Sequence, residues 1–312
     1  MTLTHYYKTC EQAKLKRDFF SIRMISLICI NNPVEVFVKN PDQKIIVMSD
    51  VHLTNNGEKI IGLDPVRKLE RALDHALCTH GDAVQIVFTG DLAHNGTQEQ
   101  YSILKEVVRG IDIPITYMMG NHDRREAFAE IFPSVPFNED GFLQSAVTYD
   151  NHKLLFLDTL HVSSFKRDRS KGFLCYKRLR WLESELKYSG QKKVIVFMHH
   201  PAFEVGFNAM DKIRLINDNE FFLSLDKHKK VIHLISGHIH RTISGNVRGY
   251  GFSVFKSTCH QMPMMFNSDN VKLSSDEPSA YGILLLKDSS VIVHSEDYEL
   301  SGSQNAIFKS CV

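Results

Sequence analysis

The sequence has few cysteines, and they form no recognisable pattern. The 6 cysteines among the 312 residues are widely scattered and include no CxxC pair. A chain of this length can bury one large apolar core and needs no covalent cross-links for stability. We therefore expect reduced thiols, one main domain and a cytoplasmic location.

An excess of charge of one sign is also missing. Lys and Arg number 37 and Asp and Glu number 36, which leaves a formal net charge of +1. Without a strong electrostatic field the chain has no general attraction for polyanions. We therefore expect no nucleic-acid polymer as a partner.

No apolar run is long enough to cross a membrane. Residues 19–30 follow basic residues as a signal peptide would, but Arg23 interrupts the run and no small-residue cleavage site follows. The run also falls short of the roughly 20 apolar residues that a membrane span needs. We expect no membrane partner. We predict that residues 1–43 form a leader that is either flexible or packed on the edge of the core, where residues 34–38 alternate as an edge strand would.

The chain does contain short apolar runs that alternate with amphipathic stretches. The runs indicate buried strands and the stretches indicate helices, an order that predicts an α/β fold. Asp64 as N-cap and Pro65 at the first helical position begin one helix. Alternating segments on either side of residues 150–151 predict a β-hairpin that starts a second sheet. Strands are predicted at 45–48, 84–88, 115–119, 194–198 and 231–235, then at 252–255, 283–286 and 291–293.

Each of the first five strands ends in side chains that bind metals. Gly90 permits a sharp turn after residues 84–88, so Asp91 stands at a strand's carboxyl end, where one carboxylate can bridge two ions. A Gly-Asp pair alone more often marks an ordinary turn, but five such strand ends favour a site. Open α/β sheets bind ligands there, and carboxylate with imidazole suits Mn, Fe, Co or Zn. The candidates are Asp50, His52, Asp91, Asn121, His122, His199, His200, His238 and His240.

The spacing within two motifs indicates how ligands are shared. Residues two apart on an extended segment face the same way, so Asp50 and His52 suit one metal. His238 and His240 have the same spacing, and each imidazole could reach a different ion.

In two other motifs one residue is a candidate metal ligand and the adjacent residue is expected to have a different role. Adjacent side chains point in opposite directions, so we expect only one of His199 and His200 to bind metal while the other supports it. His122 follows Asn121 and would project near the ions without binding one. We therefore predict that His122 is a general acid.

The remaining histidines are less informative. No role is assigned to His94, His161 or His233. Surface or packing roles are expected for the others, which show no such setting: His5, His75, His80, His152, His228 and His294.

Taken in order, the motifs resemble the calcineurin-like metallophosphoesterase family, in the branch of bacterial glycerophosphodiesterases and class III cyclic-nucleotide phosphodiesterases. The resemblance covers residues 44–300, and Ala202 departs from it because the family often has a second proline there. The motifs that carry it are Asp50-x-His52, Gly90-Asp91, Gly120-Asn121-His122-Asp123, His199-His200-Pro201 and Gly237-His238-x-His240. Shorter matches that favour the branch are Gly57-Glu58-Lys59, Ser170-Lys171-Gly172, Met210-Asp211 and Thr258-Cys259-His260-Gln261.

The resemblance implies a fold and a set of roles. The fold would be a four-layer sandwich of two mixed β-sheets flanked by helices. Two divalent ions, drawn from Fe, Mn, Zn and Co, would serve as cofactors. The implied ligands are Asp50, His52, Asp91 and His240 for one ion and Asp91, Asn121, His199 and His238 for the other. Asn121, His122 and His260 would lie near the substrate phosphate.

These observations together predict a dinuclear metal-dependent phosphodiesterase. It would hydrolyse small phosphodiesters, either a cyclic nucleotide such as cAMP or a glycerophosphodiester, by attack of a hydroxide that bridges the ions. A phosphomonoesterase of the same fold is the alternative, because the ligands determine the reaction better than the substrate. A non-catalytic scaffold is disfavoured because no candidate ligand is missing.

The organisation of the chain follows from the same reading. Residues 44–300 form the predicted catalytic domain and residues 301–312 a tail. Residues 259–280 are long and irregular, which predicts a lid or a subunit contact. The partner is a small-molecule phosphodiester, and a homodimer or a higher homo-oligomer is left open.

Overall fold

The structure is a computed structural model that describes residues 43–162, 169–288 and 290–299. Residues 1–42 of the predicted leader, with its edge strand at 34–38, and the predicted tail lie outside the described residues. Gln43, the last residue of the predicted leader, begins the first strand.

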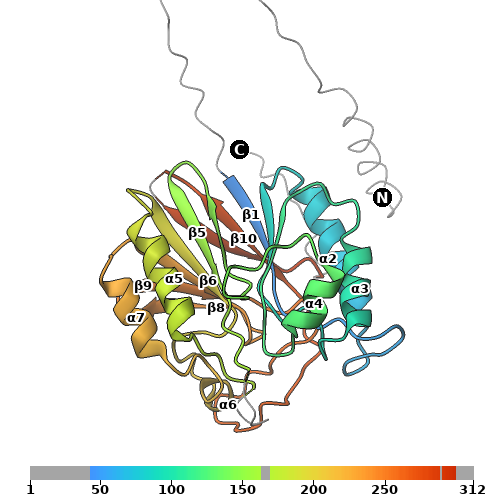
Figure 1. The fold of residues 1–312 in the computed structure, drawn as a ribbon. Coiled ribbons are helices and arrows are strands. Elements are labelled where there is room, and N and C mark those ends of the chain that lie inside the picture. Colours follow the sequence, from blue (N-terminus) through green and yellow to red (C-terminus); the bar gives the residue numbers. More distant parts are fainter. Residues whose placement is uncertain (1–42, 163–168, 289, 300–312) are drawn as a thin grey trace, which may run out of the picture.

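Two mixed β-sheets form the centre of the fold (Figure 1). In the first sheet β1, β2 and β3 are parallel, whereas β10 runs antiparallel to both β1 and β11. Its strand order is β11 (Val291–Glu296), β10 (Tyr281–Leu286), β1 (Gln43–Met48), β2 (Gln85–Phe88) and β3 (Ile115–Tyr117).

The second sheet has a parallel centre and antiparallel edges. The predicted hairpin pairs β4 with β5, and β8 pairs with β9 at the other edge. The order is β4 (Ser145–Thr148), β5 (His152–Leu157), β6 (Lys193–Met198), β7 (Val231–Ser236), β9 (Tyr250–Val254) and β8 (Ile243–Val247).

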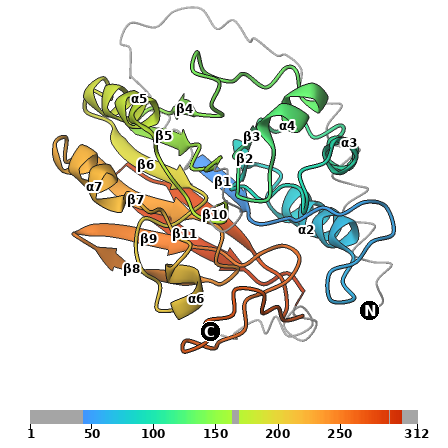
Figure 2. The same cartoon turned by 60° about the horizontal axis from the view of Figure 1, so that its bottom comes forward.

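Helices cover the outer face of each sheet (Figure 2). The first sheet packs against α2 (Pro65–Thr79), α3 (Gln98–Val107) and α4 (Arg125–Ile131). The second packs against α5 (Tyr176–Lys187) and α7 (Asp218–Asp226), with the short α6 (Asn208–Asp211) nearby. The predicted four-layer α/β sandwich of two mixed sheets is therefore confirmed.

Strand β1 shows how the alternation of side chains builds these layers. Ile46 and Met48 face the helices of the first sheet, whereas Ile45 and Val47 face the second sheet. All four are buried. Successive side chains of a strand point to opposite faces, so an uninterrupted apolar run can serve two cores at once. Burial of each such side chain contributes roughly 1.5–3 kcal/mol.

The local signals were confirmed at some boundaries and wrong at others. The Asp64 side chain caps α2, because its Oδ1 accepts from the backbone N–H of Val66 at 3.1 Å and of Arg67 at 3.2 Å. The strand predicted at 115–119 ends earlier, at Tyr117. Three elements were not predicted. They are α4, which buries only Phe128 and has no side-chain N-cap, the four-residue α6 and the largely exposed β8.

Two further expectations concern thiols and membranes. Cys175 and Cys259 are free thiols, whereas Cys78 is disulfide-bonded and departs from the expectation of reduced thiols. Within the described part of the chain, none of the helices has the length and apolar character that crossing a bilayer requires.

Candidate metal centre

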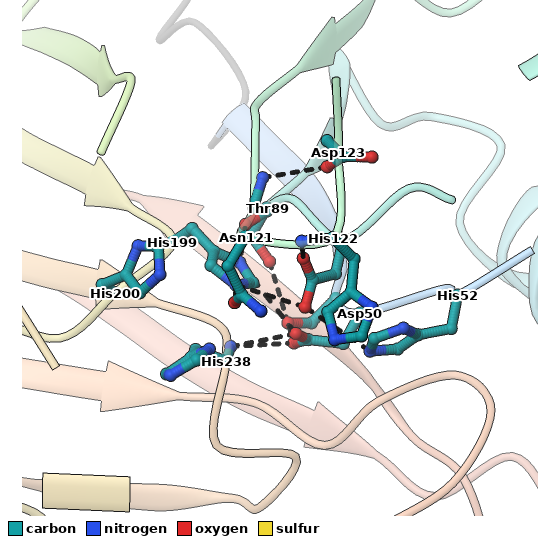
Figure 3. Close-up of polar contacts among 12 residues, drawn as sticks. Asp50, His52, Thr89, Asn121, His122, Asp123, His199, His200 and His238 are labelled. Atoms are coloured by element: carbon teal, nitrogen blue, oxygen red, sulfur yellow. Dashed lines mark hydrogen bonds and ion pairs between the residues drawn. The ribbon is translucent and has the colours of Figure 1, made fainter. Parts of the chain in front are cut away.

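The polar side chains that follow five strands meet at one edge of the two sheets (Figure 3). Asp50 follows β1, Asp91 follows β2 and Asn121 follows β3. His199 and His238 follow β6 and β7 of the second sheet. Parallel neighbours bring their carboxyl ends to the same edge. The convergence expected from the sequence is therefore present.

Several of these residues have an unusual backbone. A positive φ is rare for residues other than glycine and costs of order 1–3 kcal/mol, so it persists only where the surroundings impose it. The φ angles are 50° at Asp50, 46° at His52, 48° at Asp91, 71° at His238 and 54° at His240. Asp50 and His52 therefore do not lie on the extended segment that their spacing predicts. Their convergence results from left-handed turns.

The Asp91 carboxylate occupies the middle of the cluster. Its Oδ2 lies 3.5 Å from His52 Nε2 and 3.4 Å from His199 Nε2. Its Oδ1 accepts a hydrogen bond of 2.8 Å from the backbone N–H of His122. The backbone of His122 therefore holds Oδ1, while Oδ2 lies between His52, which follows the first sheet's β1, and His199, which follows the second sheet's β6.

The first half of the centre combines Asp50, His52 and His240. The Nε2 atom of His240 lies 3.4 Å from Asp50 Oδ1 and 3.1 Å from His52 Nε2. Its Nδ1 donates to the carbonyl oxygen of His260 at 2.8 Å. A neutral imidazole that donates through Nδ1 presents its lone pair on Nε2, the usual arrangement for a histidine that binds metal.

The second half combines Asn121, His199 and His238. The Nε2 atom of His199 lies 3.3 Å from Asn121 Oδ1, and its Nδ1 donates to the carbonyl oxygen of Thr89 at 2.9 Å. The backbone N–H of His238 lies 3.0 Å from Asp50 Oδ1. His200 is oriented differently, with Nδ1 2.8 Å from the hydroxyl of Thr159. His199 is thus the member of the pair that faces Asp91.

Glycine is required at two positions in this centre. Gly90 has a φ of +103°, and a Cβ there would lie 2.6 Å from His199 Nδ1. A Cβ on Gly120 would lie 2.2 Å from Asp91 Oδ1. Two strand-end turns therefore approach each other too closely for any larger residue.

Asp123 supports the centre from behind, a role that sequence reasoning missed. Its carboxylate accepts from the backbone N–H of Leu92, Ala93 and Gly120 and from the hydroxyl of Tyr101, at 2.9–3.2 Å. Burial and the neighbouring Asp91 raise its pKa to about 6. The sequence signal for this role is the place of Asp123 in the Gly120-Asn121-His122-Asp123 motif.

Three more histidines border the cluster. The ring of His122 lies 4.7 Å from that of His52, and the ring of His260 lies 4.6 Å from that of His240. His94 stacks on His122 with ring centroids 5.3 Å apart. The sequence assigned no role to His94, because nothing in its local pattern indicates a tertiary neighbour. His233 is not part of the cluster and contacts the hydroxyl of Ser253.

Burial and charge set the protonation of the centre. Burial lowers the pKa of His52 well below its ordinary value and lowers the pKa of His238 and His260 to about 3. These imidazoles are neutral at pH 7. Burial also opposes the charged form of His199, but Asp91 and Asp50 outweigh it and raise its pKa to about 9. A divalent ion would compete with that proton, because a ligating imidazole must be neutral.

The donor set fits divalent metal ions. Buried polar atoms normally have hydrogen-bond partners, but His238 Nε2 is buried and has none among the described residues. Ligand atoms in each of several groups lie within 4.8 Å of one another, close enough to hold an ion. Two such groups are His199, His200 and His238, and Asp50, His52, Asp91 and His240. Imidazole and carboxylate suit Zn, Fe, Mn or Co.

Comparison with known proteins places this geometry in context. A family model described as calcineurin-like phosphoesterase matches residues 43–242. A probable cyclic nucleotide phosphodiesterase of Rhodopseudomonas palustris is 34% identical over 260 residues, which cover 83% of this chain and 94% of that protein. A probable glycerophosphodiester phosphodiesterase of Arcobacter nitrofigilis is 32% identical over 200 residues, which cover 63% of this chain and 71% of that protein.

Solved structures show the same fold at much lower identity. A dimetal phosphatase from Danio rerio aligns with a TM-score of 0.63 at 13% identity and covers 83% of this chain and 97% of that one. A purple acid phosphatase from yellow lupin seeds aligns with a TM-score of 0.57 at 14% identity and covers 83% and 52% of the two chains. At these identities the likeness concerns the fold alone.

Proposed function

The chain belongs to the calcineurin-like phosphoesterase family and is a hydrolase of phosphoric esters, and we propose that it hydrolyses small phosphodiesters at the cluster around Asp91. The position of Asp91 Oδ2 between His52 Nε2 and His199 Nε2 carries this proposal. One oxygen shared by two sets of donors suits a pair of ions in one site.

We assign the ligands accordingly. One ion would be held by Asp50, His52, Asp91 and His240, and the other by Asp91, Asn121, His199 and His238. The His238 Nε2 atom, which has no partner among the described residues, supports the second set. The His240 Nε2 atom, which faces Asp50 and His52, supports the first. Two bound divalent ions would supply neutralisation of the phosphoryl charge and would acidify water.

The protein side chains would then position the ester and supply a proton. Water would add to phosphorus and lose a proton to the solvent, and the bond from phosphorus to the leaving oxygen would break on the opposite side. His122 lies next to His52 and would transfer its Nε2 proton to the departing oxygen. Asn121 and His260, on either side of the cluster, would contact the phosphoryl oxygens.

Phosphodiesters are favoured as substrates because relatives at 34% and 32% identity are named as phosphodiesterases of cyclic nucleotides and of glycerophosphodiesters. A panel of cyclic nucleotides, glycerophosphodiesters and paired aryl mono- and diesters tests the proposal on metal-reconstituted protein. Faster hydrolysis of diesters than of matched monoesters is expected. Hydrolysis of monoesters alone would establish the alternative, a phosphomonoesterase.

The organisation of the chain belongs to the same proposal. Residues 44–300 would form the catalytic domain, with residues 259–280 as a lid or subunit contact. His260 at the start of this segment borders the cluster, and Glu277 near its end pairs with Arg241 at 2.8 Å. A cytoplasmic location remains a prediction that cell fractionation tests.

A further inference from the structure

A cavity lies beside the cluster, and the proposed reaction does not use it. Its volume is 220 Å³, and Asn121 forms part of its wall, so it is adjacent to the proposed metal ligands. The loop between β3 and α4 forms one side, and residues that follow β5 form the other. The lining residues are Asn121, Asp123, Arg124, Arg125, Glu126, Leu160, His161, Val162 and Arg169.

Two of the charged lining residues are already occupied by structural contacts. Arg125 forms a two-pronged ion pair with the buried Asp158, with both N–O distances 2.6 Å. Asp123 is saturated by its hydrogen bonds to backbone and to Tyr101. Neither side chain is therefore available to a ligand.

Arg124 differs from its neighbour. Its side chain is exposed, and Nη1 donates to the carbonyl oxygens of Asp123 at 2.7 Å and His122 at 3.3 Å. These carbonyls orient the guanidinium but do not cancel its charge. Arg124 forms no ion pair with a carboxylate in the part of the chain that the structure describes. A fixed cation therefore stands at the mouth of the cavity, a few residues from Asn121.

The rest of the wall reinforces a preference for anions. Arg169 also lines the cavity, and Glu126 contributes an exposed carboxylate. His161 adds an imidazole whose Nδ1 has no hydrogen-bond partner within the described ranges. Guanidinium groups bind phosphate and carboxylate through paired N–H donors.

We propose that this cavity, hereafter the Arg124 cavity, binds a second anionic group of the substrate. The preferred substrates would be phosphodiesters that carry a further phosphate monoester or carboxylate outside the scissile linkage. This inference rests on the proposed phosphodiesterase function and narrows its substrate class. Arg124 would determine specificity, while cleavage of the ester would still depend on the cluster around Asp91.

A matched pair of chromogenic substrates tests the proposal on metal-reconstituted protein. Thymidine 5′-(p-nitrophenyl phosphate) and its 3′-phosphorylated form differ only by the second anion. We expect a higher kcat/KM for the phosphorylated ester, by about 10-fold, the size of one charge-assisted hydrogen bond at an exposed site. Arg124→Ala should remove this preference and leave kcat/KM for the unphosphorylated ester nearly unchanged.

Two control variants separate the effect of the Arg124 charge from the effect of its hydrogen bonds to the loop after β3. Arg124→Gln keeps an N–H donor for the carbonyls of His122 and Asp123 but removes the charge, so it should lose the preference too. Arg109→Ala removes an exposed arginine that pairs with Glu106 on α3, and it should keep the preference. A preference that is equal in the wild-type protein and in both Arg124 variants would overturn the proposal.

A second pair of substrates tests whether the anion in the Arg124 cavity is a carboxylate. Glycerophosphoserine and glycerophosphoethanolamine differ by one carboxylate. If the anion is a carboxylate, the wild-type protein prefers the serine ester and Arg124→Gln does not. A preference seen only with the thymidine pair identifies a phosphate monoester instead.

Measured affinities for nucleotides distinguish failure of this inference from failure of the proposed phosphodiesterase function. If neither the thymidine esters nor any diester of the panel above is hydrolysed, the phosphodiesterase proposal fails. Calorimetry with thymidine 3′,5′-bisphosphate and thymidine 5′-monophosphate then decides on the cavity. Tighter binding of the bisphosphate, by about 10-fold and lost in Arg124→Gln, supports it. Equal affinity for the two nucleotides rejects it.

Discussion

The Nδ1 atom of His122 lies 2.6 Å from the carbonyl oxygen of His94. This hydrogen bond fixes Nδ1 as the donor toward the protein and leaves Nε2 for the substrate. The partner is a backbone atom from the loop after β2, so the orientation of His122 does not depend on another titrating side chain. A histidine held in this way can exchange a proton only through Nε2.

His122→Ala should therefore reduce activity in proportion to how poor the leaving group is. General acid catalysis contributes typically 10²–10⁴-fold and follows Brønsted behaviour, so a glycerol or ribose leaving group should lose about 100-fold or more. A p-nitrophenyl ester should lose far less. Steady-state kinetics on both esters, with metal content measured in parallel, provides the test. Equal losses would indicate a role in phosphate binding, and loss of metal would make His122 a ligand.

Asp91→Ala should remove activity more completely than any other single ligand change, because this carboxylate is proposed to serve both ions. Elemental analysis should show that both metals are lost. Asn121→Ala provides the comparison, since its side chain belongs to only one proposed set. An Asp91 variant that retains two metals per chain and normal turnover contradicts the shared role.

Gly120→Ala should disturb the centre without changing a ligand. Its Cβ would lie 2.2 Å from Asp91 Oδ1, so the carboxylate or the loop must move. A displacement of about 1 Å can cost 10²-fold in rate, and we expect a loss of about that size in kcat with reduced metal affinity. Gly110→Ala is the control: no atom lies within 4 Å of its added Cβ, so alanine at its φ of +78° should lower stability but leave kcat and metal affinity unchanged. Similar activities of the two variants would argue against the close approach.

The segment 259–280 presents apolar side chains to the surface. Met264, Met265 and Phe266 are 57%, 54% and 51% exposed. If the segment is a lid or a subunit contact, replacing all three by serine should either raise the ratio of bulky-ester to small-ester hydrolysis or lower the mass in solution. Leu223→Ser, at the 59% exposed Leu223 on α7, is the control. An unchanged ratio and an unchanged mass would rule out both roles.

The buried contacts of Glu299 should make the free energy of unfolding depend on pH. Its carboxylate lies 2.7 Å from Lys68 Nζ and accepts from the backbone N–H of Ser279 at 3.0 Å. Burial opposes ionisation, but the contact with Lys68 outweighs it and lowers the pKa of Glu299. Because the pKa of Glu299 is lower in the folded state, its ionised carboxylate stabilises the fold fully above the unfolded pKa of about 4.3. This contribution is lost as the pH falls through the folded pKa.

Glu299→Gln should therefore reduce the free energy of unfolding at pH 7 by roughly 1–3 kcal/mol. The difference from the wild-type protein should shrink as the pH falls below about 4.3. Denaturant titrations at pH 7 and at several values below pH 5 measure it. Glu106→Gln, at an exposed pair with Arg109, should change little at any pH. A difference that does not vary with pH would mean that the Glu299 charge is not the stabilising feature.

Much of the candidate centre was visible in the sequence alone. Ligand-type residues come at the ends of short apolar runs, so Asp50, Asp91 and His199 could be placed at strand ends by local signals. The α/β class and the hairpin between β4 and β5 were visible for the same reason. These features depend on residues that are neighbours in the chain, and their steric preferences act locally.

Tertiary structure decided how those residues meet. The left-handed turns at Asp50 and His238 set the directions of their side chains, and no spacing rule for extended segments could supply them. The sharing of Asp91 Oδ2 between His52 and His199 requires the two sheets to pack at a particular register. The Arg124 cavity combines a loop after β3 with residues that follow β5, and the packing of distant segments depends on the whole core rather than on local preference.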